Sequence, residues 1–137
     1  YHRALAMPRF IGIDYGDVRV GTATSDDSEA FAFPDTVMGT SDEDAKSLLD
    51  RVASSGGISG IVVGLPLNFG GAETEQTAKV REYARRLGTF TSAPIFFENE
   101  VLTTTTVTKN NAAKSGMVDA SAAALILQQF LDKRRKA

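Results

Sequence analysis

The stretch FIGIDYGDVRVGTATS, residues 10–25, decides the fold. It opens with a short apolar run that ends in an acid, Asp14, and the turn signal Tyr-Gly-Asp follows directly. From Val18 to Ser25 the residues alternate well enough to form a second strand. The stretch therefore predicts a β-hairpin at the start of the folded domain.

The segments after the hairpin carry strand and helix patterns in turn. Residues 31–38 predict a third strand, and Pro34 favours an edge or a bulge for it. Beyond it the sequence predicts a helix over 41–54, a buried strand over 60–64, a loop over 65–71, a helix over 72–87, a strand over 94–97 that closes in 98–100, a loop over 109–116 and a helix over 117–133. We therefore expect a single α/β domain with a mixed five-stranded sheet, antiparallel hairpin first, flanked by helices.

The last predicted helix has the clearest amphipathic pattern in the chain. Apolar and uncharged residues recur there at helical spacing, which predicts a face that packs on the sheet. The predicted inner stripe consists of Ala122, Leu125, Ile126, Gln129 and Phe130.

The composition leaves oxygen groups as the main source of chemistry. The chain has 137 residues, a net charge of −2, one histidine and no cysteine. Without cysteine the chain has no disulfide scaffold, no thiolate zinc site and no cysteine nucleophile. The single histidine, His2, argues against a multi-histidine metal site and a Ser-His-Asp triad. Carboxylates and hydroxyls remain, and these hard oxygen ligands suit Mg²⁺ or Mn²⁺.

The same composition bears on location. No run approaches about 18 consecutive apolar residues, so we expect no membrane span. The lack of cysteine fits a reducing compartment, and we expect a cytoplasmic protein. Residues 1–6 precede Met7 and resemble neither a signal peptide nor a transit peptide. We expect them to be a remnant of an expression vector, with the domain spanning 7–137.

Two groups of basic residues stand out against a mildly acidic background. The net charge argues against a broadly basic nucleic-acid binder, but not against a local contact. Each group alone is explained more simply by a solvated helix face or by cations that suit a helix C-terminus. The groups are Lys79, Arg81, Arg85 and Arg86 on one predicted helix, and Lys133, Arg134, Arg135 and Lys136 at the C-terminus.

Three acids fall at structurally similar places. Asp14 ends the first strand, Glu100 ends the last strand and Asp119 opens the final helix. The carboxyl ends of adjacent parallel strands open onto one crevice, and a helix packed on the first strand can begin there. Three carboxylates would repel one another unless cations neutralise them, and two Mg²⁺ or Mn²⁺ ions would do so. The arrangement would suit phosphodiester hydrolysis.

Each acid also has a simpler interpretation. Asp14 can make an Asx-turn in the hairpin, and Asp119 can be the N-cap of the last helix. Glu100 can be a solvated surface acid, and its neighbour Glu98 is expected on the opposite face of the strand. On spacing alone, both sets of interpretations stay open.

Four motifs, in the same order and at similar separations, resemble those of the YqgF (RuvX) family. Residues 13–21, IDYGDVRVG, are similar to its opening Asp-x-Gly-x-x-Arg-x-Gly, and residues 63–71, VGLPLNFGG, to its Val-Gly-Leu-Pro-Leu-Asn loop. Residues 99–104, NEVLTT, resemble its Asp-Glu-Arg-Leu-Thr-Thr element, and 118–128, VDASAAALILQ, its last helix. The resemblance covers about 8–133.

The resemblance implies an RNase H-like fold, similar to that of Holliday junction resolvases. Members of the family are described as nucleases that process the 5′ end of pre-16S ribosomal RNA. By position, Asp14, Glu100 and Asp119 match the family's acidic residues and would be its catalytic residues and metal ligands. Arg19 would contact a phosphate or pair with one of the acids.

The resemblance also implies where nucleic acid would bind. Asn68 and the backbone of Gly70 and Gly71 would line the rim of the active site and meet the strand. Lys114 would be a further contact to nucleic acid. Phosphate contacts of this kind position a strand, whereas RNA is distinguished by its shape and its 2′-hydroxyls.

The chain departs from the family pattern in two places on this nucleic-acid side. Asn99 and Val101 stand where the family has Asp and Arg. By the resemblance, loss of the Arg removes either a cation near the scissile phosphate or an ion-pair partner. The segment 105–117 is shorter than its family counterpart and carries only Lys109 and Lys114 as basic residues.

We therefore carry three hypotheses. The first is a metal-dependent nuclease acting on structured RNA, at the 5′ end of pre-16S rRNA. The second is a Holliday junction resolvase-like DNA endonuclease, which would cut as a two-fold dimer. The third is a catalytically weak nucleic-acid-binding adaptor. An ATPase of the actin and sugar-kinase type would need a second lobe, which 137 residues do not supply. We expect a monomer or a weak homodimer.

Overall fold

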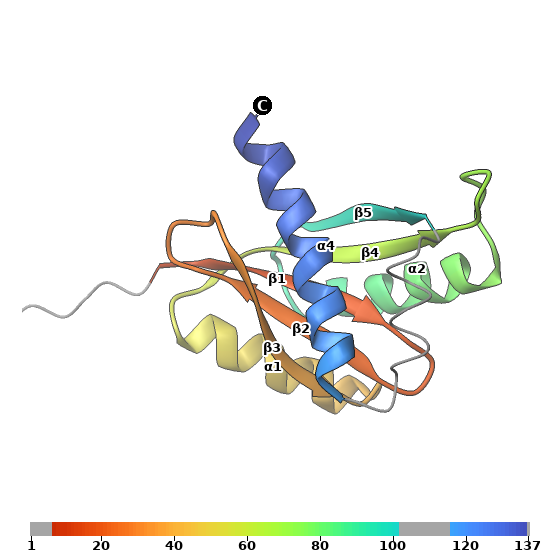
Figure 1. The fold of residues 1–137 in the computed structure, drawn as a ribbon. Helices are drawn as coiled ribbons and strands as arrows, with labels where there is room; N and C mark the ends of the chain where they lie inside the picture. The colour runs from red at the N-terminus through yellow and green to blue at the C-terminus, as the bar shows by residue number, and fades with distance from the viewer. Residues whose placement is uncertain (1–6, 102–115, 137) are drawn as a thin grey trace, which may run out of the picture.

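The computed structural model describes residues 7–101 and 116–136 (Figure 1). Its centre is a five-stranded sheet with the strand order β3-β2-β1-β4-β5. The strands are β1 (Arg9–Tyr15), β2 (Val20–Ser25), β3 (Ala32–Met38), β4 (Ile58–Leu67) and β5 (Ile95–Val101). The helices are α1 (Asp42–Ser54), α2 (Glu75–Gly88) and α4 (Gly116–Lys136).

The sheet is mixed, as the sequence predicts. β1 pairs antiparallel with β2, and β2 pairs antiparallel with β3. β1 pairs parallel with β4, and β4 with β5. The predicted hairpin is thus confirmed, and the carboxyl ends of β1, β4 and β5 share one edge of the sheet.

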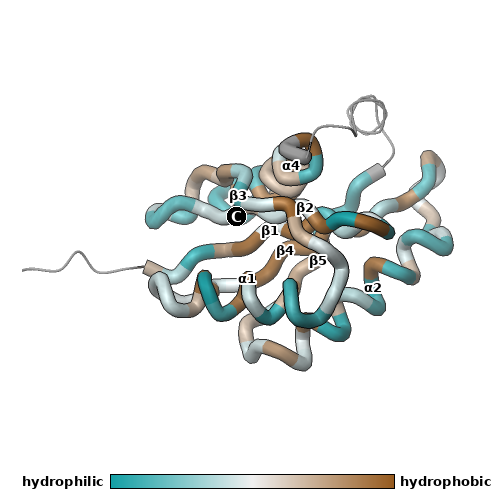
Figure 2. Tube along the Cα trace, turned by 90° about the horizontal axis from the view of Figure 1, so that it is seen from below, coloured by the Kyte–Doolittle hydropathy of each residue, from teal (hydrophilic) through white to brown (hydrophobic). Residues whose placement is uncertain are grey.

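Helices cover both faces of the sheet (Figure 2). α1 and α2 lie on one face, where a large apolar core forms from β1, β4 and both helices. α4 crosses the other face alone and covers a smaller core that includes Phe10, Val62 and Leu127. On that face, α4 is the helix that approaches the carboxyl ends of the strands. Its position therefore determines which residues can lie together at that end of the sheet.

The helix starts follow local capping. The Ser41 hydroxyl accepts a hydrogen bond from the backbone N–H of Asp44 at 3.1 Å, which is the predicted cap of α1. α2 begins at Glu75, not at residue 72, because Thr74 caps it and forms a reciprocal box with Thr77.

β4 is longer than the sequence predicts. The expected loop over 65–71 is wrong for its first three residues, since β4 runs on to Leu67. Leu65 pairs with Asn99, and Pro66 with Glu100 in β5. The extension depends on this neighbouring strand, which ends at Val101, one residue beyond its predicted end at Glu100.

The predicted inner stripe of α4 is partly wrong. Ala122 and Ile126 are buried and Phe130 packs against the core, but Leu125 is 50% exposed and Gln129 is exposed. The buried face is rotated by about one residue from the predicted stripe, so residues next to the predicted positions are buried in place of Leu125 and Gln129. Four alanines lie in the first half of this helix, and they tolerate either face, so the pattern does not fix the rotation. The buried apolar residues are Ala120, Ala122, Ala123, Ile126, Leu127 and Leu131.

No helix in the described part of the chain is both long enough and apolar enough to cross a membrane.

Candidate active site

Asp14 and Asp119 meet at the carboxyl end of β1. Asp14 lies in β1 directly opposite Gly21 of β2. A Cβ on Gly21 would stand 2.0 Å from the carbonyl oxygen of Asp119, so the first turn of α4 rests on this glycine. Asp14 is 6% exposed and Asp119 is 8% exposed. Two acids far apart in sequence are therefore both buried on the face that α4 covers, with the backbone of Asp119 against the residue that pairs with Asp14.

Two further glycines let α4 lie close to the sheet. A Cβ on Gly12 would stand 2.8 Å from the carbonyl oxygen of Ala123. A Cβ on Gly64 would stand 2.5 Å from Cδ1 of Ile126. Because side chains alternate along a strand, the residue two positions after Gly12, Asp14, points to the same face as α4.

Glu100 lies in β5, which is separated from β1 by the parallel strand β4. Val63 pairs with Ile13, so Gly64 is level with Asp14 in the sheet. Glu100 lies in β5 opposite Pro66, and its Oε1 stands 3.6 Å from the place of a Cβ on Gly64. The Glu100 side chain thus leans back over Gly64 toward β1. All three predicted acids lie on one face of the sheet near its carboxyl edge.

Glu98 belongs to the same face, which corrects the sequence prediction. It is 4% exposed, and its Oε2 accepts a hydrogen bond from Nζ of Lys133 in α4 at 2.6 Å. The expectation that Glu98 points away from Glu100 is wrong, because residues two apart in a strand share a face. Glu98 is a fourth carboxylate on this face of the sheet, and strand alternation was the signal for it.

Arg19 pairs with Asp119. Its Nε donates to Oδ2 of Asp119 at 2.8 Å, and its side chain is 42% exposed. Arg19 lies in the hairpin turn just before β2, not within the strand. The resemblance implies either a phosphate contact or an ion pair with an acid for Arg19, and the structure shows the ion pair.

The simpler interpretations of two acids do not hold. Asp119 lies in the first turn of α4, which begins at Gly116, so it is not the N-cap. An Asx-turn at Asp14 would use the backbone N–H of Gly16, but this N–H donates to the carbonyl of Arg19 at 2.9 Å.

The loop after β4 is closed by Asn68. Its Oδ1 accepts hydrogen bonds from the backbone N–H groups of Gly70 and Ala72, both at 2.9 Å. The backbone N–H of Asn68 also donates to the carbonyl of Ala72 at 3.0 Å. Gly71 has a φ of 81°, which favours glycine. The side-chain oxygen Oδ1 of Asn68 therefore holds the loop together. Lys114, the last predicted contact, lies outside the described residues.

The basic group on α2 is engaged in ion pairs with its acidic neighbours. Each of its four residues lies within 3.5 Å of a carboxylate oxygen. This supports the interpretation of a solvated helix face. The pairs are Lys79–Asp17, Arg81–Glu73, Arg85–Glu82 and Arg86–Asp42.

The donor set suits a divalent cation by its chemistry. Asp14, Glu100 and Asp119 offer only carboxylate oxygens, which Mg²⁺ and Mn²⁺ prefer. Two of the three are more than nine-tenths buried on the face of α4. Within residues 7–101 and 116–136, however, no three acidic, histidine or cysteine side chains gather closely enough to form a complete ligand set. The three carboxylates would therefore have to draw closer together to hold one ion between them.

A five-stranded mixed sheet in this order, with a helix crossing one face, defines an RNase H-like α/β fold. The model of the RuvX family, described as Holliday junction resolvase, matches residues 8–133. The chain belongs to this family, which confirms the resemblance seen in its motifs.

Relatives and solved structures agree with this assignment. A protein of Paramagnetospirillum magneticum named "Putative pre-16S rRNA nuclease" is 35% identical over 92% of this chain and 86% of its own length. A protein of the same name from Nitratidesulfovibrio vulgaris is 38% identical over 90% of this chain and 93% of its own. The RuvC of T. thermophilus, solved with a Holliday junction substrate, aligns with a TM-score of 0.55 at 13% identity, over 93% of this chain and 96% of that one. That likeness concerns the fold.

Proposed function

We propose that the protein is a metal-dependent nuclease that hydrolyses phosphodiester bonds in structured RNA, at the 5′ end of pre-16S rRNA. The observation that carries the proposal is the buried pair of carboxylates, Asp14 and Asp119, at the edge to which Glu100 also leans. The names of the relatives support rRNA precursor as the substrate. Such a substrate would place the protein in the cytoplasm.

The side chains have distinct parts in this proposal. Asp14 and Asp119 would hold the metal, with Glu100 as the third ligand. Bound Mg²⁺ or Mn²⁺, in a pair, would lower the pKa of an attacking water and stabilise charge on the leaving oxygen. Arg19 fixes the orientation of the Asp119 carboxylate through its Nε. Burial of both aspartates excludes water from one side of the site, so charges there are screened less.

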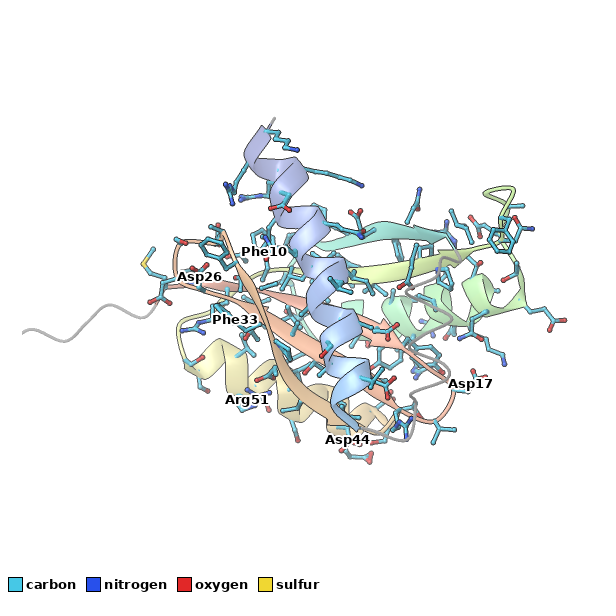
Figure 3. All side chains as sticks on the ribbon, in the orientation of Figure 1. Phe10, Asp17, Asp26, Phe33, Asp44 and Arg51 are labelled. Carbon is cyan, nitrogen blue, oxygen red and sulfur yellow. The ribbon has the colours of Figure 1, made fainter. Side chains whose placement is uncertain are left out.

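A cleavage assay tests the proposal. Wild type, Asp14→Asn and Asp17→Asn would be compared in Mg²⁺ and in Mn²⁺ on an RNA that contains the 5′ leader of 16S rRNA. Asp17 is the matched control, because it is an exposed acid in the adjacent turn (Figure 3) and is 59% exposed in its ion pair with Lys79. We expect Asp17→Asn to cleave like wild type and Asp14→Asn to lose at least about 100-fold in rate. Equal cleavage by wild type and Asp14→Asn would contradict the proposal.

A DNA junction is the second candidate substrate, favoured by the description of the matching family model. Paired nicks in a four-way junction need two active sites related by a two-fold axis. The same assay with a DNA four-way junction, together with the solution mass, distinguishes the two substrates. Symmetric nicking of the junction by a dimer would indicate that the substrate is junction DNA and not RNA.

The adaptor hypothesis rests on Asn99 and Val101. Asn99 is exposed and lies in β5 next to Glu100. The protein could bind RNA but cleave neither RNA nor the DNA junction, in Mg²⁺ or in Mn²⁺. That result would overturn the nuclease proposal in favour of an adaptor.

A further inference from the structure

Phe69 is the most exposed aromatic residue in the described part of the chain. It is 79% exposed, compared with 57% for Phe31 and 54% for Phe33. A phenyl ring gains free energy from burial, so this exposure leaves a large apolar surface without a partner in the isolated protein. A single exposed apolar residue is common, and its meaning depends on where it lies and how it is held.

The loop around Phe69 is ordered by specific hydrogen bonds. Oδ1 of Asn68 binds two backbone N–H groups, and the N–H of Gly71 donates to the Asn68 carbonyl at 2.9 Å. Gly71 supplies the positive φ that the turn needs. A closed loop restricts the backbone that carries the ring, which reduces the entropy lost when a ligand binds to it.

The loop also lies at the end of the sheet that carries the acids. Pro66, three residues before Phe69, pairs with Glu100. The segment between β4 and α2 projects beyond the carboxyl end of β4 (Figure 1). Asp17, labelled in Figure 3, marks the same end of the sheet. The loop that carries Phe69 therefore lies at the acid-bearing end of the sheet.

We propose that Phe69 stacks on an unpaired base of the RNA strand that enters this site. The proposal rests on the proposed function and adds a feature of the substrate, a single-stranded nucleotide beside the scissile bond. Every base has a π-face that an aromatic ring can cover, so such a contact recognises unpaired bases without reading sequence. In duplex RNA the bases are already stacked, and the ring would find no face. Asn68 then acts as a positioning residue that holds the stacking ring.

The chain contains no tryptophan, so Phe69→Trp places a single reporter at the proposed contact. Its fluorescence would be titrated with a 12-nucleotide oligo(U), whose bases stack little, and with the same strand paired to oligo(A), in EDTA to prevent cleavage. We expect saturable quenching by the single strand and at least tenfold weaker quenching by the duplex. Phe33→Trp is the control, because Phe33 is exposed on β3, away from the acid-bearing end (Figure 3). It should show no saturable quenching.

Affinity provides the second measurement. We expect Phe69→Ala to weaken binding of the single strand by roughly 5- to 150-fold, Phe69→Tyr to retain it and Phe33→Ala to leave it unchanged. In cleavage assays Phe69→Ala should raise KM more than it lowers kcat. No quenching of Phe69→Trp, equal quenching by duplex, or wild-type affinity in Phe69→Ala would overturn the proposal. These binding readouts need no metal, so their failure is distinct from failure of the Asp14→Asn test.

Discussion

Tyr83 carries a hydroxyl that is buried with no hydrogen-bond partner among the described residues. The residue is 1% exposed, and its ring lies 4.6 Å from that of Tyr15, centroid to centroid. Burial disfavours the charged phenolate and raises the pKa of Tyr83 from 10.0 to about 12. The native state therefore keeps a proton that the unfolded chain releases between these pH values. The corresponding stability is present below pH 10 and is lost as the pH rises through about 12.

Replacement of this hydroxyl tests both statements. Tyr83→Phe removes an unpaired buried polar group, so we expect the free energy of unfolding at pH 7 to rise by about 1 kcal/mol. The fall in stability between pH 10 and about 12 should also become shallower than in wild type. Urea unfolding followed by circular dichroism between pH 7 and pH 11.5 measures both effects. A variant less stable than wild type at pH 7 would indicate that the hydroxyl has a partner.

At the same scale, the sequence predicts the acids better than their surroundings. Asp14, Glu100 and Asp119 follow from their places at element ends and from the family motifs. The pairing of Arg19 with Asp119 was one of two alternatives, because it depends on how α4 approaches the hairpin turn. The sequence does not single out Phe69, because the exposure of a residue within a loop depends on the backbone around it.

Among the elements, α4 is the one whose placement decides the site. Its first turn rests on Gly21, where any side chain would meet the carbonyl of Asp119. We expect Gly21→Ala to displace this turn, to lower the free energy of unfolding by about 1–3 kcal/mol and to reduce cleavage more than tenfold. Denaturant unfolding and the leader RNA assay measure the two effects.

Gly70→Ala is the matched control for Gly21→Ala. The nearest atom to a Cβ on Gly70 is Oδ1 of Asn68 at 3.5 Å, an ordinary contact. It should change stability by less than about 0.5 kcal/mol. If Gly21→Ala behaved in the same way, the close approach of α4 to β2 would not be needed.

The element boundaries show which parts of the fold local sequence patterns cannot predict. The hairpin over 10–25 and the cap at Ser41 are local, and both are confirmed. The extension of β4 to Leu67 depends on pairing with a strand about 30 residues later, which no local pattern encodes. The rotation of α4 depends on glycines in β1, β2 and β4 that admit its backbone. Long-range contacts thus decide what local propensity leaves open.

For the whole molecule, the balance of charge limits how nucleic acid can be attracted. The net charge is −2, and the basic group on α2 is offset by carboxylates. Lys133, in the C-terminal group, is held by the buried Glu98. Broad attraction to a phosphate backbone is therefore weak, and cations bound at the acids would supply positive charge where the strand must approach.

Binding of these cations should appear as stability of the whole domain. A ligand that binds only the native state stabilises it by mass action, by roughly 1.4 kcal/mol for a Kd of about 1 mM and 10 mM Mg²⁺. For a domain of this size we expect Tm to rise by about 3–6 °C in scanning calorimetry. Asp14→Asn should lose more than half of that increment, and Asp17→Asn should keep it, because Asp17 lies outside the acid site. The same increment in all three proteins would mean that Mg²⁺ binds elsewhere, and no increment in wild type would exclude a preformed site for it at Asp14 and Asp119.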